Sequence, residues 1–412
     1  MTAVRREMEK LRQKEHDFSA KLRQESIIER FRDYVTWQRR RLAAASTQDH
    51  PEKGPVSINL DLTAACNYSC PHCVDSGIIN TGRFMKTEVV KKTVDTLQSG
   101  GLLSIILVGG GEPTLHKDFE EIVRFIKNRG LQLGIVTNGS RLGSVIEAAG
   151  VLEIKDWVRI SLDAAKEDTY VKLHRPKNRV TLQEILRNAQ KLKTRNPRIS
   201  LGYSFVIVWE GIQLNGHELC PNTTEMSEAV RMAGEYGFDY ISFKPCLVRL
   251  EDSQKESLLD NVKREKEKAI LKEIKSSLEK AKKAAEGKVK ILESVNLRAM
   301  LNNRVSELKR QPKTCHMQFF SSVVTPSGIF HCPAFRGVEK VKIAGPGGYA
   351  GKSAFDKTLQ NVDQSLTSFD AEQECSVVGC FYNHVNWWIE NFILSNKSVD
   401  DLEKIEDDNF FL

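Results

Sequence analysis

Residues 66–73 read Cys-Asn-Tyr-Ser-Cys-Pro-His-Cys and place three cysteines, Cys66, Cys70 and Cys73, on one short loop. The spacing C-x3-C-x2-C can hold three corners of a four-iron cluster while the fourth iron keeps no protein ligand. An iron left open in this way can bind a substrate or a cofactor. The three cysteines are therefore the first candidate metal ligands of the chain.

Apolar runs typical of buried strands alternate with amphipathic helical stretches around this loop and beyond it. Repeated strand-helix units imply a parallel sheet with helices outside it, either flat or curled into an incomplete barrel. In such sheets the chemistry takes place at the carboxyl ends of the strands. The predicted strands are 56–62, 103–108, 132–136, 157–162, 200–208 and 240–243, and the helices between them include 87–98, 118–129, 182–194 and 224–236.

Unusual polar residues directly follow the first four of these strands. The cysteine loop comes after the first strand, and Gly-Gly-Gly-Glu-Pro-Thr at 109–114 comes after the second. Thr-Asn-Gly at 137–139 follows the third strand, and Ser161 and Asp163 mark the end of the fourth. Because parallel strands end at the same edge of a sheet, we expect one functional site at that edge.

The composition fits a large enzyme of the cytoplasm. The chain has 412 residues, of which 40% are hydrophobic, and this is enough for one large domain with attachments. No apolar run approaches the roughly 20 residues of a membrane span, and the first residues lack the apolar core of a signal peptide. We therefore expect a cytoplasmic protein with no membrane partner, whose nine cysteines stay reduced and whose closely grouped cysteines bind metal rather than form disulfides.

The net charge of +7 is concentrated in peripheral segments. Residues 1–50 form a basic segment with a helical pattern, in which Arg39, Arg40 and Arg41 could contact nucleic acid. Acidic residues are interleaved through the same segment, so we interpret it as a solvated helical face. A nucleic-acid partner is not expected.

The composition changes after residue 250. Residues 250–312 are rich in Lys and Glu and predict a charged helical connector, either a helical hairpin packed on the main domain or a coiled-coil interface. Residues 313–412 then carry a second cysteine group, and a predicted β-hairpin around Pro-Ser-Gly at 326–328 brings its first two members together. Four thiolates suit a closed Zn²⁺ site or an iron-sulfur cluster equally well. The group consists of Cys315, Cys332, Cys375 and Cys380.

In this order, the cysteine loop and the Gly-Gly-Glu run resemble those of the radical S-adenosylmethionine enzymes, over roughly residues 56–246. The resemblance implies a partial (β/α)6 TIM-like barrel at 51–249. It also implies that the cysteine loop binds a catalytic [4Fe-4S] cluster, which ligates S-adenosylmethionine. Reductive cleavage of that cofactor would give a 5′-deoxyadenosyl radical that abstracts hydrogen from a substrate, as in an oxidoreductase or a lyase.

The same resemblance implies contacts with the cofactor. His72 would lie against the adenine, the Gly-Gly-Glu run would receive the methionine amino group, and the fourth strand would offer polar groups to the ribose or the carboxylate. Ser161 and Asp163 could equally cap the next helix, and Asn-Gly is also an ordinary turn pair. No catalytic side chain is assigned. The implied cofactor-binding residues are His72, Gly110, Gly111, Glu112, Asn138, Ser161 and Asp163.

Cys315, Gly328 and Cys332 resemble the opening of the SPASM and twitch extensions, which attach an auxiliary [4Fe-4S] cluster to these enzymes. Gly328 is followed by three residues before Cys332, where the family usually has four, and the full seven-cysteine set is absent. We therefore expect one auxiliary cluster on the four cysteines, in the shorter twitch-like form. Cys246 is either a core residue or a replacement for Cys375, and Cys220 is interpreted as a bystander.

The sequence does not identify the substrate. Enzymes with such extensions act on peptides, sugars, nucleosides and cofactor precursors, and Lys244, at the end of the sixth strand, is a candidate for binding an anionic group. The resemblance also implies an external electron donor of the flavodoxin or ferredoxin type. The alternative hypothesis is a zinc-binding or degenerate scaffold that binds a partner through its charged helices.

Overall fold

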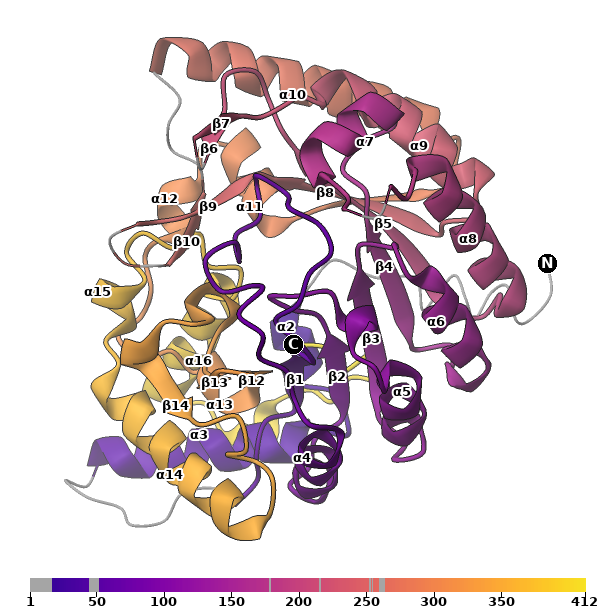
Figure 1. Ribbon diagram of the computed structural model, residues 1–412. Coiled ribbons are helices and arrows are strands. Elements are labelled where there is room, and N and C mark those ends of the chain that lie inside the picture. The colour runs from indigo at the N-terminus through magenta and orange to yellow at the C-terminus, as the bar shows by residue number, and fades with distance from the viewer. Residues whose placement is uncertain are drawn as a thin grey trace.

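The computed structural model describes residues 17–43, 52–177, 179–214, 216–251, 253, 255–258 and 264–412, and it is built around one large sheet (Figure 1). Ten strands pair in the order β11-β8-β5-β4-β3-β2-β1-β12-β13-β14, and the described residues show no pairing that closes it into a barrel. These strands are β1 Ser57–Leu60, β2 Ser104–Leu107, β3 Gln132–Thr137, β4 Trp157–Ser161, β5 Ser200–Ile207, β8 Tyr240–Pro245, β11 Lys290–Glu293, β12 Ser321–Thr325, β13 Gly328–Phe330 and β14 Lys342–Ala344.

All six strands predicted from the apolar runs are present as β1, β2, β3, β4, β5 and β8. They lie side by side in chain order, and every neighbouring pair is parallel. Two short hairpins lie outside the large sheet, formed by β6 Gln213–Leu214 with β7 His217–Glu218 and by β9 Leu247–Arg249 with β10 Glu256–Leu258. The expected α/β fold, an incomplete barrel of parallel strands, is confirmed.

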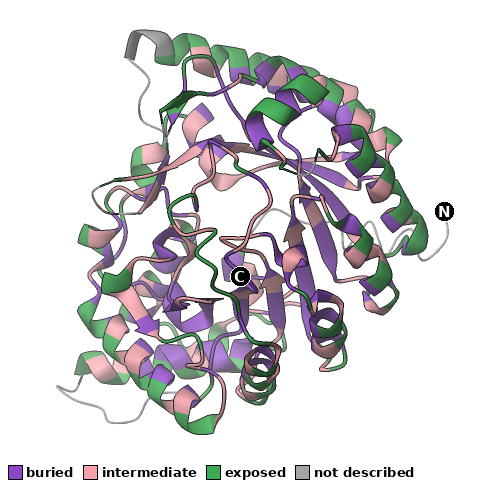
Figure 2. Cartoon of the chain, viewed as in Figure 1, coloured by how far each residue is buried: buried purple, intermediate pink, exposed green. Residues whose placement is uncertain are grey.

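Amphipathic helices cover the outer face of this sheet. α5 buries Ile122, Val123 and Ile126, and α8 begins at a capping box in which Thr181 and Glu184 satisfy each other's backbone amides. Buried residues fill the strands and the inward faces of the helices, while exposed residues line the outside (Figure 2). The four predicted helices are confirmed. The helices around the barrel are α4 Thr87–Ser99, α5 Phe119–Lys127, α6 Leu142–Ala148, α7 Glu167–His174, α8 Leu182–Arg195, α9 Met226–Glu235 and α10 Arg264–Ala284.

The C-terminal region continues the same sheet. β12 pairs in parallel with β1, and β12, β13 and β14 then run antiparallel, so the predicted hairpin is present and is joined to the core. Residues 250–312 are not purely helical, because β11 adds a parallel strand beside β8. Local charge patterning predicts α10 but carries no signal for this strand. The remaining helices are α11 Val295–Leu301, α12 Val305–Leu308, α13 Met317–Phe320, α14 Lys352–Ser368, α15 Ala371–Glu374 and α16 Asn383–Leu394.

The N-terminal helices α2 (Phe18–Leu22) and α3 (Ile28–Ala43) pack against this C-terminal region. The rings of Phe31 and Trp388 stack with centroids 4.9 Å apart. Arg39 donates to backbone carbonyls in the last turn of α16 and just after it, including that of Lys397 at 2.8 Å, so part of the basic segment binds the protein itself. The parts of the predicted segment at 1–16 and 44–50 lie outside the described residues.

The C-terminal tail covers the amino ends of the strands. Ser104 Oγ donates to the Phe410 carbonyl at 2.9 Å, and the Phe410 amide donates to Gln132 Oε1 at 2.9 Å. The Phe411 ring meets Trp157 edge-on. Because this end of the sheet is filled by the tail, the carboxyl ends of the strands remain as the place for a site.

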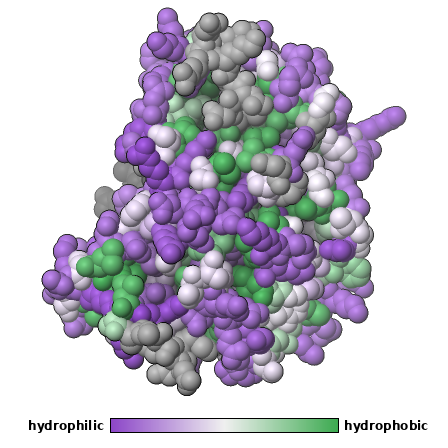
Figure 3. Space-filling model, turned by 90° about the vertical axis from the view of Figure 1, so that its left-hand side faces the viewer, coloured by the Kyte–Doolittle hydropathy of each residue, from purple (hydrophilic) through white to green (hydrophobic). Residues whose placement is uncertain are grey.

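The molecular surface is mixed in character. The face in Figure 3 is mostly hydrophilic, with separate hydrophobic patches between the polar residues. Among the helices in the described part of the chain, none has the length and apolar content to cross a membrane.

Candidate active site

The cysteine loop leaves the carboxyl end of β1 and is held on several sides by hydrogen bonds. The Cys66 amide donates to Asn80 Oδ1 at 2.9 Å, and the Ser69 amide donates to the carbonyl of His174, at the end of α7, at 3.2 Å. Tyr68 is 1% exposed and shares a hydrogen bond with the hydroxyl of Tyr170, also on α7. The loop is therefore docked rigidly between β1 and α7.

The three thiols of this loop converge. The Cys70 thiol interacts electrostatically with those of Cys66 and Cys73, and Cys73 does so with Cys66. Burial, followed by nearby negative charge, raises the pKa of Cys73 to about 12, and the pKa of the other two thiols is also raised. Three thiolates so close together need a cation between them, and three soft sulfur donors on one loop fit the three protein-bound irons of a [4Fe-4S] cluster.

A single metal ion is a different case. Among the described residues, no three His, Cys, Asp or Glu side chains lie close enough to one another to hold one ion. A four-iron cluster is larger than one ion, so its cysteine ligands stand farther apart.

The Gly-Gly-Glu run lies directly against the cysteine loop. The Glu112 amide donates to the Ala65 carbonyl at 2.8 Å, and the Gly110 amide donates to Asp61 Oδ2 at 3.1 Å. A Cβ atom on Gly111 would lie 2.4 Å from the carbonyl oxygens of Thr63 and Ala65. Glycine is required there because the two loops meet backbone to backbone.

The Gly111→Ala variant should therefore be destabilised by about 1–3 kcal/mol, because the added methyl group has no space between two backbone oxygens that cannot rotate away. Gly143→Ala, in α6, is the matched control, since a Cβ there meets nothing within 4 Å. That change should stabilise the helix by about 0.5–1 kcal/mol. Thermal unfolding of the two variants checks this, and a Gly111→Ala midpoint at or above the wild-type value would contradict it.

The side chain of Glu112 is occupied by the protein. Its Oε1 accepts hydrogen bonds from the Thr114 and Thr137 hydroxyls at 2.6 and 2.7 Å, and its Oε2 accepts from the Asn138 amide at 2.7 Å. The residue is 3% exposed, and burial raises the pKa of its carboxyl despite these donors. The carboxylate ties the turn after β2 to the turn after β3, so a ligand amino group would meet the backbone of this run more readily than its carboxylate.

Asn138 joins the same assembly. Its Nδ2 donates to Asn67 Oδ1 at 3.0 Å, and its side chain also lies beside the Cys66 thiol. The predicted residues of the first three strand ends are thus brought together around the cysteine loop.

Two histidines connect the cysteine loop to the end of β4. His72 Nε2 lies 3.1 Å from Asp163 Oδ2, and the His174 ring lies between Asp163 and the Cys70 thiol, with Nδ1 3.4 Å from the sulfur. Burial alone would raise the pKa of Asp163, but the hydrogen bond with His72 and the charge interaction with His174 lower it. Burial lowers the pKa of His174 to about 4. Asp163 is therefore an ionised carboxylate at neutral pH.

Asp163 does not cap the following helix. Its Oδ1 accepts from the Val206 amide at 2.7 Å, whereas α7 begins after Lys166 without a side-chain cap. Ser161 is the last residue of β4, is half-buried, and faces Ser204 of β5 in the sheet register. His174 was not predicted, because a lone histidine at the end of a helix gives no sequence signal for a neighbouring thiol.

The second cysteine group also converges. The Cys375 thiol interacts with those of Cys315, Cys332 and Cys380, and the Cys332 thiol interacts with those of Cys315 and Cys380. Burial raises the pKa of all four thiols, that of Cys380 to about 12. Asn386 Nδ2 donates to Cys315 Sγ at 3.8 Å. Hydrogen bonds of this kind to a ligand sulfur influence the reduction potential of a bound cluster. Four sulfurs grouped in this way, three of them on buried residues, fit an iron-sulfur cluster.

The leftover cysteines lie elsewhere. Cys246 is fully buried and interacts with Asp163 on the barrel side. Cys375, which Cys246 was expected either to replace or to leave in place as a ligand, itself faces the other three cysteines of the second group. Cys220 is half-buried and lies against the carbonyl of Pro221 at 3.9 Å.

A buried charge network joins the two cysteine regions, and nothing in the sequence predicted it. Arg336 follows Cys332 in the chain, and its guanidinium lies 3.1 Å from Asp61 Oδ2 and 3.0 Å from Asp75 Oδ2. Arg249 lies 2.8 Å from the other oxygen of Asp75 and donates to the Arg336 carbonyl at 3.1 Å. Asp61 directly follows β1 and Asp75 follows the cysteine loop, so Arg336 fastens the C-terminal region to the first candidate site.

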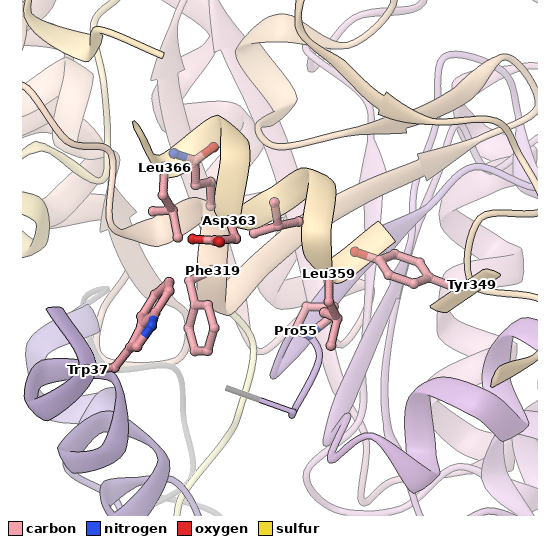
Figure 4. Close-up of a pocket in the computed structure, with 9 residues that line it drawn as sticks. Trp37, Pro55, Phe319, Tyr349, Leu359, Asp363 and Leu366 are labelled. Atoms are coloured by element: carbon pink, nitrogen blue, oxygen red, sulfur yellow. The ribbon is translucent and has the colours of Figure 1, made fainter. Parts of the chain in front are cut away.

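The small cavity in Figure 4 is not a second candidate. It lies among α3, α13 and α14, with Trp37, Pro55 and Leu359 in its wall, and its volume of about 10 Å³ leaves space for one water molecule at most. Pro55 precedes β1, so the cavity lies near the end of this strand that is opposite the cysteine loop.

Comparison with known proteins agrees with this geometry. Residues 60–212 match the family model of the Radical SAM superfamily. An S-adenosylmethionine-dependent nucleotide dehydratase of Selenomonas ruminantium is 32% identical over 121 residues, 28% of this chain and 42% of that protein. A probable GTP 3′,8-cyclase of Pyrococcus horikoshii is 30% identical over 183 residues, 44% of this chain and 53% of that protein. The alignments thus span about half of these relatives or less.

Among solved structures, Streptococcus suis SuiB bound to the precursor peptide SuiA is similar to this chain with a TM-score of 0.56. The match covers 82% of this chain and 72% of SuiB, at 14% sequence identity. At this low identity the structural likeness shows a shared fold alone, and the fold extends well beyond the cysteine loop.

Proposed function

Because residues 60–212 form a radical S-adenosylmethionine domain, we propose that the chain is an enzyme that removes a hydrogen atom from its substrate by radical chemistry. The observation that carries the proposal is the convergence of Cys66, Cys70 and Cys73 beside the Gly-Gly-Glu run. When bound at this loop, a [4Fe-4S] cluster and S-adenosylmethionine supply a 5′-deoxyadenosyl radical that abstracts the hydrogen.

The chain's own residues hold and orient these groups. The three thiolates anchor the cluster, and the backbone of the Gly-Gly-Glu run leaves room for close approach by the methionine part of the cofactor. Asp163, paired with His72, keeps the cysteine loop against the end of β4, where Ser161 is available to polar groups of the cofactor. No acid-base side chain is needed for this chemistry.

We propose that Cys315, Cys332, Cys375 and Cys380 hold one auxiliary [4Fe-4S] cluster, and that an external flavodoxin or ferredoxin supplies electrons. Such clusters persist where thiols stay reduced, which supports a cytoplasmic location. Named relatives act on nucleotides, and SuiB binds a precursor peptide, so the proposed substrate is a small molecule or a peptide.

Anaerobic reconstitution tests the proposal. About eight irons with matching sulfide are expected from two four-iron clusters, together with 5′-deoxyadenosine after reduction in the presence of S-adenosylmethionine. A protein with only about four irons would lack the auxiliary cluster but keep the proposed activity. Zinc at both sites, or full iron loading without cofactor cleavage, would instead support the scaffold hypothesis.

A further inference from the structure

Two basic side chains share the inner face of the sheet, away from the covering helices. In β4, Val158 and Ile160 are fully buried toward the helices, so Arg159 projects from the opposite face. The register of β4, β5 and β8 puts Lys244 on that same face. Lys244 Nζ reaches back along the sheet and donates to Ser204 Oγ at 3.3 Å.

Neither cation is neutralised by the described residues around it. Within the described ranges, no carboxylate oxygen lies within ion-pair distance of either one, and Arg159 Nε is buried without a hydrogen-bond partner. Burial and then the charge of Arg159 lower the pKa of Lys244 to about 7, and the opposing effect of Asp163 is smaller. The Asp163 oxygens are already engaged by His72 and the Val206 amide. Among the described residues, the inner face therefore carries positive charge with no carboxylate paired to it.

The pair lies on strands other than those that lead into the cysteine loop and the Gly-Gly-Glu run. The cysteine loop follows β1 and the Gly-Gly-Glu run follows β2, whereas Arg159 belongs to β4 and Lys244 to β8. A cofactor that is anchored beside β1 and β2 and reaches Ser161 at the end of β4 would leave the side of the barrel formed by β5 and β8 to the substrate.

We propose that Arg159 and Lys244 form a subsite for an oxyanion, a carboxylate or phosphate group of the substrate. The inference rests on the proposed function, because it assumes that the substrate enters the barrel. A guanidinium offers a planar fork to two oxygens, and an ammonium adds a point charge, so together they suit either group. A bound oxyanion would offset the cost of burying two like charges.

The reconstituted holoprotein, saturated with S-adenosylmethionine, is titrated separately with inorganic phosphate and with acetate in a calorimeter. At least one of these anions should bind, and Lys244→Met and Arg159→Gln should each weaken binding about tenfold, the loss expected for one charge-assisted hydrogen bond. Lys244→Arg should restore most of the affinity. Lys191→Met, an exposed lysine change on α8, is the matched control and should bind like the wild type.

Binding of phosphate alone assigns a phosphorylated substrate, and binding of acetate alone assigns a carboxylate. Absence of binding, or equal binding by the wild type and both charge-removing variants, overturns the subsite. Competition between the anion and S-adenosylmethionine also overturns it, because the pair would then serve the carboxylate of the cofactor. Formation of 5′-deoxyadenosine by the same wild-type preparation is measured separately, so failure of the proposed function is distinguished from failure of the subsite.

Discussion

Replacing Cys70 with alanine is expected to abolish formation of 5′-deoxyadenosine and to lower the iron content from about eight to about four atoms per chain. Cys70 stands in the middle of the loop, and its thiol interacts with both Cys66 and Cys73. Removing it leaves only two protein ligands for a cluster that already has one open iron. Iron and sulfide analysis after anaerobic reconstitution, followed by chromatographic detection of 5′-deoxyadenosine, measures both effects.

Two further cysteine variants make this prediction specific. Cys332→Ala should disrupt the second cysteine group while the irons of the first loop remain. Cys220→Ala should change neither quantity, because its thiol contacts only a backbone carbonyl among its described partners. A Cys70→Ala protein that still yields 5′-deoxyadenosine at the wild-type rate would refute the assignment of the catalytic cluster.

The parallel core could be predicted from local pattern alone. The apolar run at 200–208 corresponds to β5, Ser200–Ile207, and the amphipathic stretch at 182–194 corresponds to α8, Leu182–Arg195. These elements are fixed by the burial of a strand on both faces and by one apolar stripe on a helix. Strand pairings between distant segments could not be predicted in this way. Neither the position of β12 beside β1 nor the position of β11 beside β8 leaves a local signal in the sequence.

In the candidate site, too, some features could be predicted from the sequence and others could not. The grouping of Cys66, Cys70 and Cys73 follows from sequence spacing, and their place beside Gly111 follows from the common ends of parallel strands. The role of Glu112 does not follow from the sequence. A carboxylate directly after a strand indicates a ligand-binding group, but in the structure the hydroxyls of Thr114 and Thr137 donate hydrogen bonds to it. Side-chain partners depend on the three-dimensional packing, which spacing does not encode.

Arg336 is the clearest case of such a contact. Its partners Asp61 and Asp75 belong to the barrel, and all three residues are at most 5% exposed. Burial raises the pKa of Asp61 to about 6 even though Arg336 acts to lower it, so the pair is held at a considerable solvation cost. Because Asp61 also accepts from the Gly110 amide, the arginine supports both the cysteine loop and the Gly-Gly-Glu run.

The Arg336→Met variant is therefore expected to lose about 3–5 kcal/mol of stability, the usual cost of leaving one side of a buried ion pair without its partner. The loss should extend to both cysteine groups, because Arg336 joins the segment after Cys332 to the loop that ends near Asp75. Denaturant unfolding of the holoprotein measures the stability, and iron retention during dialysis measures the two sites.

Matched variants separate this network from a general effect of removing an arginine. Arg195→Met, an exposed change at the end of α8, should unfold like the wild type. Arg336→Lys should recover only part of the stability, because one ammonium cannot reproduce the forked contacts to Asp61 and Asp75. Adding Asp61→Asn to Arg336→Met should recover some of the loss, since it removes a buried charge that the single variant leaves unpaired. If the Arg336→Met variant instead unfolds at the same denaturant concentration as the Arg195→Met variant, the network does not hold the two cysteine regions together.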